Sequence, residues 1–191
     1  MKIVLASGSP RRKEMLERFN IDLLIIKSDM IERVDSGQEP IQIAMSLAFE
    51  KAYEVSKSFM EDLVIGADTI VVDEGRILGK PKDEEDAFNM LRSLSAKSHE
   101  VITGLCLIDN SKHLKIVDYE RTKVKFKYLS HRLIKSYLDT GEYMDKAGSY
   151  AIQGKGAVLV EKIDGCYSNV VGLPLSKLDY ILSRFFSINI L

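Results

Sequence analysis

Charged side chains stand at a few points of this chain where packing alone would call for none. The segment LASGSPRRKEML (residues 5–16) leaves a short apolar strand and places Arg11 and Arg12 in the first turn of a predicted helix. The N-terminus of a helix carries unpaired N–H groups and a partial positive charge, so it favours anions and disfavours arginines. Two arginines at this point therefore indicate a negatively charged ligand, and phosphate is the anion we expect.

Lys51 falls in the middle of the apolar face of the helix that we expect after Pro40. At helical spacing this face consists of Ala44, Leu47, Ala48 and Val55. A lysine on a buried face must find a partner or reach into a cleft. The alternative is that its stem extends along the apolar surface and the ammonium escapes to water.

Asp68 places a carboxylate inside LVIGADTIVV (residues 63–72), an otherwise apolar strand. An unpaired buried carboxylate is costly, so a cation should lie beside it. At a strand end it could bind a metal or act as a general base, whereas the alternative is an aspartate that caps a loop. Lys80, between Gly79 and Pro81, adds a cation before a helix, although loop lysines are common and mostly solvated.

Three glycines frame Gln153 in DKAGSYAIQGKG (residues 145–156), a segment with no apolar period. Such a stretch lets the backbone approach a ligand, and a carboxamide can read a base edge through its donor and acceptor. The alternative is a glycine-rich connector. Arginines and lysines neutralise phosphate oxygens, while a carboxylate holds Mg²⁺ or activates water. Together, these residues predict an α/β enzyme that handles phosphates.

The pattern of elements predicts an α/β fold with a mixed β-sheet flanked by helices. We expect one domain over residues 1–191, without repeats or linkers. AVLVEKI and CYSNVV should pair as a hairpin across Asp164-Gly165. The expected strands are 1–6, 22–27, 63–72, 99–108 and 114–128. The expected helices are 10–19 with Ser9 as candidate N-cap, 40–59, one that is capped by Asp83 and includes Leu94, 130–138 and one from Pro174.

Composition argues against several classes of partner. The 191 residues carry 27 Lys and Arg against 28 Asp and Glu, so no global field attracts nucleic acid or an anionic membrane. The lysines of residues 112–127 indicate a hydrated strand face, and His99 a structural hydrogen bond. Cys106 and Cys166 lack metal-ligand spacing, and no long apolar run is present. We therefore expect a reduced, cytoplasmic protein that binds neither nucleic acid nor membrane.

The chain resembles the Maf family over essentially its whole length. ASGSPRR, LAFEKA, GADTIVV, GKP, SHEVITG, DKAGSYAIQG and NVVGLP occur in the order found in that family. The resemblance implies an ITPase-like (Maf/Ham1) fold and a cytoplasmic nucleoside triphosphate pyrophosphatase that requires a divalent metal, Mg²⁺ or Mn²⁺. Such an enzyme would remove unwanted nucleotides from the nucleotide pool. DKAGSYAIQG is similar to the branch that acts on dTTP and UTP, and differs from the branch that acts on 7-methyl-GTP.

The same resemblance implies roles for individual positions. Asp68 matches the proton acceptor, and Glu32 a second metal ligand beside Asp68. The positions linked to base choice are Arg11, Thr69 and Gln153, and the polar positions that we assign to the triphosphate are Ser7, Arg12, Lys51 and Lys80. A homodimer is an expectation from the fold alone.

Two other functions stay open at this stage. One is a nucleotidyltransferase, which also opens with a strand and a small-residue loop, although residues 7–10 hold a single glycine. The other is a regulator of cell division that binds nucleotides without turning them over.

Overall fold

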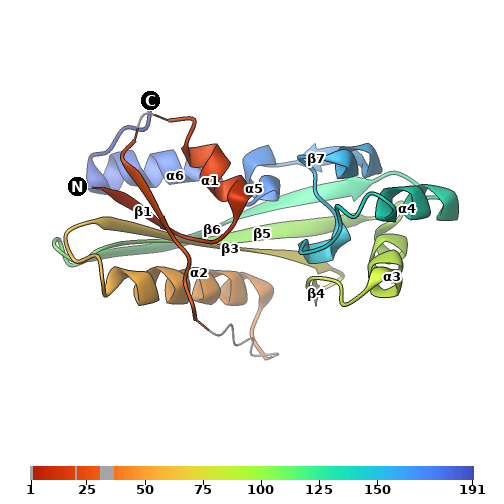
Figure 1. Cartoon of the computed structure of the whole chain (residues 1–191), viewed down its shortest axis with the longest axis horizontal. Coiled ribbons are helices and arrows are strands. Elements are labelled where there is room, and N and C mark those ends of the chain that lie inside the picture. Colours follow the sequence, from red (N-terminus) through yellow and green to blue (C-terminus); the bar gives the residue numbers. More distant parts are fainter. Residues whose placement is uncertain (1, 20, 31–36) are drawn as a thin grey trace. The chain divides into compact units, whose positions relative to one another are not determined.

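Seven strands form one mixed β-sheet (Figure 1). The computed structural model describes residues 2–19, 21–30 and 37–191. The sheet has the order β2-β1-β3-β5-β6-β7, with β4 paired to β3. Its strands are β1 (Ile3–Ala6), β2 (Leu23–Ile26), β3 (Leu63–Asp73), β4 (Arg76–Leu78), β5 (Ser98–Asp109), β6 (Leu114–Phe126) and β7 (Val160–Asp164). Because β1 is parallel to β2 and β3 while β4 and β7 are antiparallel to their partners, the predicted mixed sheet is confirmed.

Contacts along the chain group into two compact units. The first consists of Met1–Thr69, Thr103–Glu120 and Gly172–Leu191, and the second of Ile70–Ile102 and Arg121–Val171. The expectation of a single domain over residues 1–191 stays a prediction. Among the described residues, no helix has the length and apolar character needed to cross a membrane.

The first unit is built around β1, which has β2 on one side and β3 on the other. Helix α1 (Pro10–Leu16) connects β1 to β2, and α2 (Pro40–Ser56) connects β2 to β3. The two helices lie on opposite faces of these strands (Figure 1). The carboxyl end of β1 is therefore a topological switch point, the position where open α/β sheets bind ligands.

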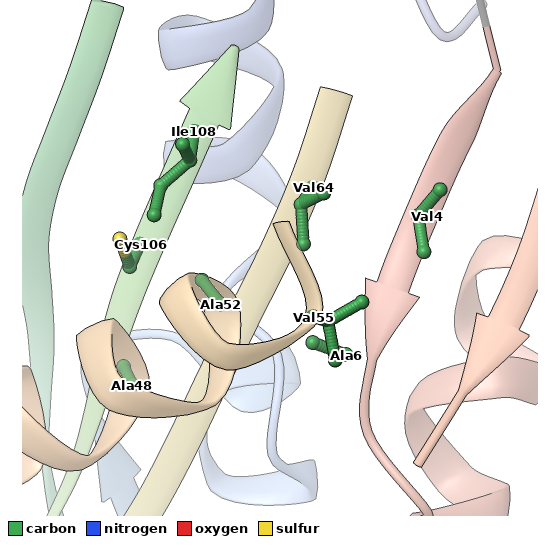
Figure 2. Packing of buried hydrophobic residues seen from close by; sticks show 8 residues of the cluster. All are labelled: Val4, Ala6, Ala48, Ala52, Val55, Val64, Cys106 and Ile108. Atoms are coloured by element: carbon green, nitrogen blue, oxygen red, sulfur yellow. The ribbon is translucent and has the colours of Figure 1, made fainter. Parts of the chain in front are cut away.

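Helix α2 packs against the sheet through small residues and two strand glycines. Ala48, Ala52 and Val55 cover a cluster on β1, β3 and β5 (Figure 2). A Cβ added at Gly66 of β3 would lie 2.3 Å from the Ala48 carbonyl oxygen, and one at Gly104 of β5 would lie 2.1 Å from the Ala44 carbonyl oxygen. Since no side chain fits at either position, the helix backbone rests directly on the two strands.

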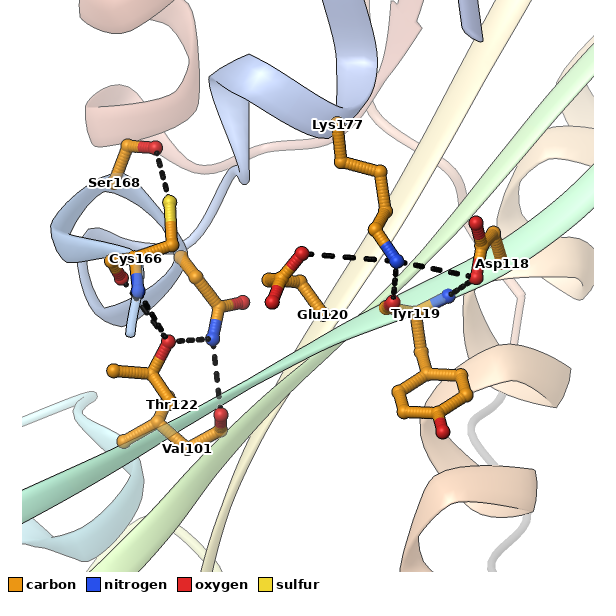
Figure 3. A network of polar contacts seen from close by, with 9 residues as sticks. Val101, Asp118, Tyr119, Glu120, Thr122, Cys166, Ser168 and Lys177 are labelled. Carbon is orange, nitrogen blue, oxygen red and sulfur yellow. Dashed lines mark hydrogen bonds and ion pairs between the residues drawn. The ribbon is translucent and has the colours of Figure 1, made fainter. Parts of the chain in front are cut away.

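Helix α6 (Leu175–Ile181) is tied to β6 through one lysine (Figure 3). The Lys177 ammonium donates to the Tyr119 carbonyl oxygen and lies 3.3 Å from Asp118 Oδ1 and 3.6 Å from Glu120 Oε2. The last helix was expected from Pro174, and that start is confirmed. The helix continues as a π-helical turn over Leu182–Phe186.

The second unit contains α3 (Glu84–Leu94), α4 (His131–Leu138), α5 (Tyr167–Val171) and the 3₁₀ turns Ala147–Ser149 and Lys155–Leu159. Asp83 caps α3 as predicted, because its side chain accepts from the Asp86 N–H at 2.8 Å. Buried His99 lies 2.8 Å from Tyr150 Oη through Nε2 and packs edge-on against Phe126 and Tyr150. The expectation that His99 is a structural hydrogen-bonder is confirmed.

The hairpin predicted for AVLVEKI and CYSNVV is wrong. The strand β7 pairs with β6 instead, and residues 167–171 form the short helix α5. Thr122 Oγ1 of β6 accepts from the Cys166 N–H at 3.0 Å and from Asn169 Nδ2 at 2.9 Å (Figure 3). Asn169 Nδ2 also donates to the Val101 carbonyl at 3.0 Å. These bonds hold the segment as a helical turn, which an apolar pattern alone cannot reveal.

Other differences concern element ends. The helices end at Leu16 and Ser56, where the sequence favoured 19 and 59. β4 was not expected, although Glu74 and Gly75 both have positive φ, at 48° and 80°, as the centre of a tight hairpin requires.

We expect the Gly66→Ala substitution to lower the free energy of unfolding by about 1–3 kcal/mol, because the added methyl group must push α2 off the sheet. Urea unfolding measures the change. Gly79→Ala is the control, since nothing lies within 4 Å of a Cβ added there. Equal stability of the two variants would contradict a direct helix–strand contact.

A second prediction concerns pH. Burial lowers the pKa of His99 from its ordinary value of 6.5 to about 4. Below pH 6.5 the unfolded chain therefore binds a proton that the folded chain does not bind. As the pH decreases from 6.5 to about 4, the free energy of unfolding should fall by up to about 1.4 kcal/mol per pH unit. Urea unfolding at pH 7 and pH 5 should give a flatter pH dependence in His99→Gln. The exposed control, His113→Gln, should keep the wild-type dependence.

Candidate active site

An ion pair joins Lys51 of α2 to Asp68 of β3. Strand residues alternate between faces, so Asp68 points to the same side as Gly66, where α2 rests. Lys51 Nζ donates to Asp68 Oδ1, and only 14% and 12% of the two side chains are exposed. The lysine on the apolar helix face has thus found a partner, and the strand carboxylate has the cation that its burial requires.

The pair lies just beyond the carboxyl end of β1, beside the middle of β3. β1 ends at Ala6, which is aligned with Gly66 of β3. Asp68 and Thr69 therefore extend beyond the last paired residue of β1, where the chain turns into α1. This is the end of the sheet at which the switch point was identified.

Arg12 occupies the opposite face of β3, together with Thr69. Its guanidinium is buried and donates from Nε to the Gly172 carbonyl at 2.7 Å, from Nη1 to Ser7 Oγ at 3.1 Å, and from Nη2 to Thr69 Oγ1 at 2.8 Å. Thr69 Oγ1 also lies 2.9 Å from Thr103 Oγ1 of β5. One arginine thus fixes a loop, a strand hydroxyl and a distant carbonyl.

The turn before α1 is further ordered by Ser7. Its hydroxyl accepts from the Ser9 N–H at 3.2 Å as well as from Arg12. Ser9 occupies the N-cap position as predicted, but its side chain makes no capping hydrogen bond, and Pro10 opens the helix. The geometry of this turn therefore depends on Ser7 and Arg12, and the hydroxyl of Ser9 does not cap the helix.

Arg11 is half-buried beside this turn. Burial lowers the pKa of its guanidinium from the ordinary value, and the nearby charge of Glu14 opposes that shift. Because the cation has lost part of its hydration, an anion brought next to it would interact more strongly than at an open surface.

Comparisons with known proteins bear on the family of the chain. The family model described as Maf-like protein matches residues 2–185. The chain belongs to the Maf family. It is 52% identical over 190 residues to a Clostridioides difficile protein named dTTP/UTP pyrophosphatase, covering 100% of this chain and 98% of the relative. It is 50% identical to a Ruminiclostridium cellulolyticum protein of the same name, covering 95% of each.

A solved structure shows the fold that this Maf-family chain shares. The HAM1 protein from Coxiella burnetii matches with a TM-score of 0.52 at 14% identity, over 96% of this chain and 99% of that one. The predicted ITPase-like (Maf/Ham1) fold is confirmed.

The structure brings some of the predicted site residues together. Ser7, Arg12, Lys51, Asp68 and Thr69 lie near the carboxyl end of β1 and the middle of β3, in the first unit. Two predicted site residues lie in the second unit and are exposed, Lys80 before α3 and Gln153 in a turn. The second metal candidate, Glu32, lies outside the described residues. The functional roles assigned to all of them stay predictions.

Two residues that contact the candidate site were not predicted from the sequence. Thr103 and Gly172 both contact Thr69, at 2.9 Å and 3.3 Å. A threonine hydroxyl inside the apolar strand VITGLCLI was the available signal for Thr103. Gly172 acts through its carbonyl oxygen, which leaves no trace in residue type.

The carboxylate of Asp68 is compatible with a divalent metal. Within residues 2–19, 21–30 and 37–191, no group of three or more His, Cys, Asp or Glu is placed to hold an ion. Mg²⁺ is often held by only one or two carboxylates, with substrate phosphates and waters completing its shell. Asp68 therefore fits a metal that arrives with a phosphorylated substrate.

We expect Arg12→Lys to lower the free energy of unfolding by about 2 kcal/mol or more, because an ammonium cannot reach the three acceptors of the guanidinium fork and leaves buried groups unpaired. Arg18→Lys, at an exposed position of the same segment, is the control. Urea unfolding compares the two variants, and equal midpoints would mean that the fork does not hold this site together.

Proposed function

We propose that this Maf-family protein hydrolyses dTTP and UTP to the nucleoside monophosphate and pyrophosphate, and so removes these or modified nucleotides from the pool. The observation that carries the proposal is the pairing of Lys51 with Asp68, in the middle of β3 and just beyond the carboxyl end of β1. The names of relatives about half identical over nearly the whole chain support the choice of substrates.

The proposed reaction is an in-line attack of water on the α-phosphorus. Lys51 binds Asp68 Oδ1 and stabilises the ionised carboxylate, while Oδ2 accepts a proton from the attacking water. A bond forms between the water oxygen and the α-phosphorus as the bond to the bridging oxygen breaks, and the electron pair leaves with pyrophosphate. Positioning and charge stabilisation then supply most of the catalysis.

Cationic and hydroxyl groups would hold the substrate. Lys51 and Lys80 are assigned to the triphosphate, together with Ser7, while Arg12 adds its charge and keeps Ser7 and Thr69 in place. Arg11, Thr69 and Gln153 are assigned to base choice. Asp68, with Glu32, would hold Mg²⁺ or Mn²⁺, which supplies neutralisation of phosphate charge when bound. A cytoplasmic location fits these substrates and the two free cysteines.

Asp68→Asn tests the proposal directly. We expect turnover of dTTP and UTP to fall by about 100-fold or more, because the amide cannot accept the proton. The variant should still fold but with a lowered unfolding midpoint, because the buried ammonium of Lys51 loses its counter-charge. The measurement is release of dTMP and pyrophosphate with Mg²⁺ or Mn²⁺, and exposed Asp22→Asn is the control. Wild-type rates in Asp68→Asn would place the base elsewhere, and release of dTDP and phosphate would contradict the cleavage site.

A further inference from the structure

One carboxylate anchors the turn that carries Gln153. Glu142, four residues beyond the end of α4, accepts the Lys155 N–H at Oε1 and the Gly156 N–H at Oε2, each at 2.9 Å. Hydrogen bonds to an ionised carboxylate are stronger than those between neutral groups. Both oxygens of Glu142 therefore hold the backbone directly after Gln153.

Gly154 makes room for this anchor. A Cβ added to Gly154 would lie 1.9 Å from Glu142 Oε1 and 2.6 Å from its Cδ. The φ of Gly154 is −114°, so the glycine is not required by a left-handed backbone conformation. A side chain at this position would instead have to displace the Glu142 carboxylate from the place where it accepts the two N–H groups.

The backbone that precedes Gln153 is also held by hydrogen bonds. Tyr137 Oη accepts the Ala151 N–H at 3.2 Å, and the buried Tyr150 hydroxyl pairs with His99. Burial raises the pKa of Tyr137, and the carboxylate of Glu142 raises it further, so this phenol stays protonated. The backbone is thus held both before and after Gln153.

Gln153 itself points outward from the anchored turn. Its side chain is exposed and forms no hydrogen bond with any residue that the structure describes. A carboxamide offers one acceptor and two donors, which can match one base edge and mismatch another. Such recognition depends on placement to within about 0.5 Å, and a turn achieves this only when its backbone is held.

We propose that Glu142 is a positioning residue for base selection, which holds the Lys155 and Gly156 N–H groups so that the Gln153 carboxamide meets the nucleobase edge. This inference rests on the proposed function and adds a residue that determines its specificity. Glu142 acts through Gln153 and does not touch the phosphates that react.

UTP and CTP are the probes, because uracil and cytosine differ in the donors and acceptors of one edge. We expect Glu142→Ala to reduce the ratio of kcat/KM for UTP over CTP at least tenfold, through a higher KM for UTP with kcat nearly unchanged. Glu142→Gln should cause a smaller loss than Glu142→Ala. Its amide oxygen still accepts one of the two N–H groups, whereas its amide nitrogen cannot accept the other. Exposed Glu161→Gln is the control and should keep the wild-type ratio.

Two double variants separate positioning from a general structural role. Gly154→Ala alone should lower the ratio as Glu142→Ala does, but should add little in the Glu142→Ala background, because the clash partner is gone. In the Gln153→Ala background, Glu142→Ala should no longer change the ratio. Urea unfolding of every variant shows how much stability each has lost.

The possible failures differ. Wild-type protein that does not hydrolyse UTP would overturn the proposed function. Wild-type selectivity retained in Glu142→Ala, or an equal loss of kcat for both nucleotides with a lowered unfolding midpoint, would overturn the positioning role alone. An effect of Glu142→Ala that persists in the Gln153→Ala background would do the same.

Discussion

The direct contact of the α2 backbone with the sheet, at Gly66 and Gly104, is the constraint on which the candidate site depends. A bulkier residue at either position would lift the helix, and Lys51 would no longer reach Asp68. Burying two opposite charges costs desolvation energy, which their attraction offsets only when the geometry is close. The glycines supply that geometry. A feature that reads as simple packing therefore decides whether the ion pair can form.

The alternation of β3 divides the chemistry of the site between two layers. Asp68 faces α2 and its lysine, while Thr69 faces Arg12 and Thr103 on the other side. β1 ends at Ala6, so both residues extend past their neighbouring strand at the same end. Two consecutive residues thus present one carboxylate and one hydroxyl group, each oriented by different elements. The contacts of Asp68 and those of Thr69 involve different partner residues.

The sequence was informative where a charged residue falls in an apolar pattern, because the cost of burying that charge is evident from its neighbours in the chain. A lysine on an apolar helix face and an acid in an apolar strand each predicted a partner, and the two pair with each other. Arg12 shows the limit, because its charge was evident but its acceptors were not, and the Gly172 carbonyl lies 160 positions away. The CYSNVV error has the same cause: a short apolar run is ambiguous, and hydrogen bonds of Asn169 to two distant strands decide its form.

Within the proposed function, hydrolysis and base choice are held in place by different physical means. Asp68 is fixed by regular elements in close backbone contact, so its position changes only if α2 or the sheet is disturbed. Gln153 stands in a turn whose position depends on hydrogen bonds from backbone N–H groups to one carboxylate. A turn held in this way can be altered by single substitutions that leave the helix–sheet contact intact. Base preference can therefore change without loss of the groups that carry out hydrolysis.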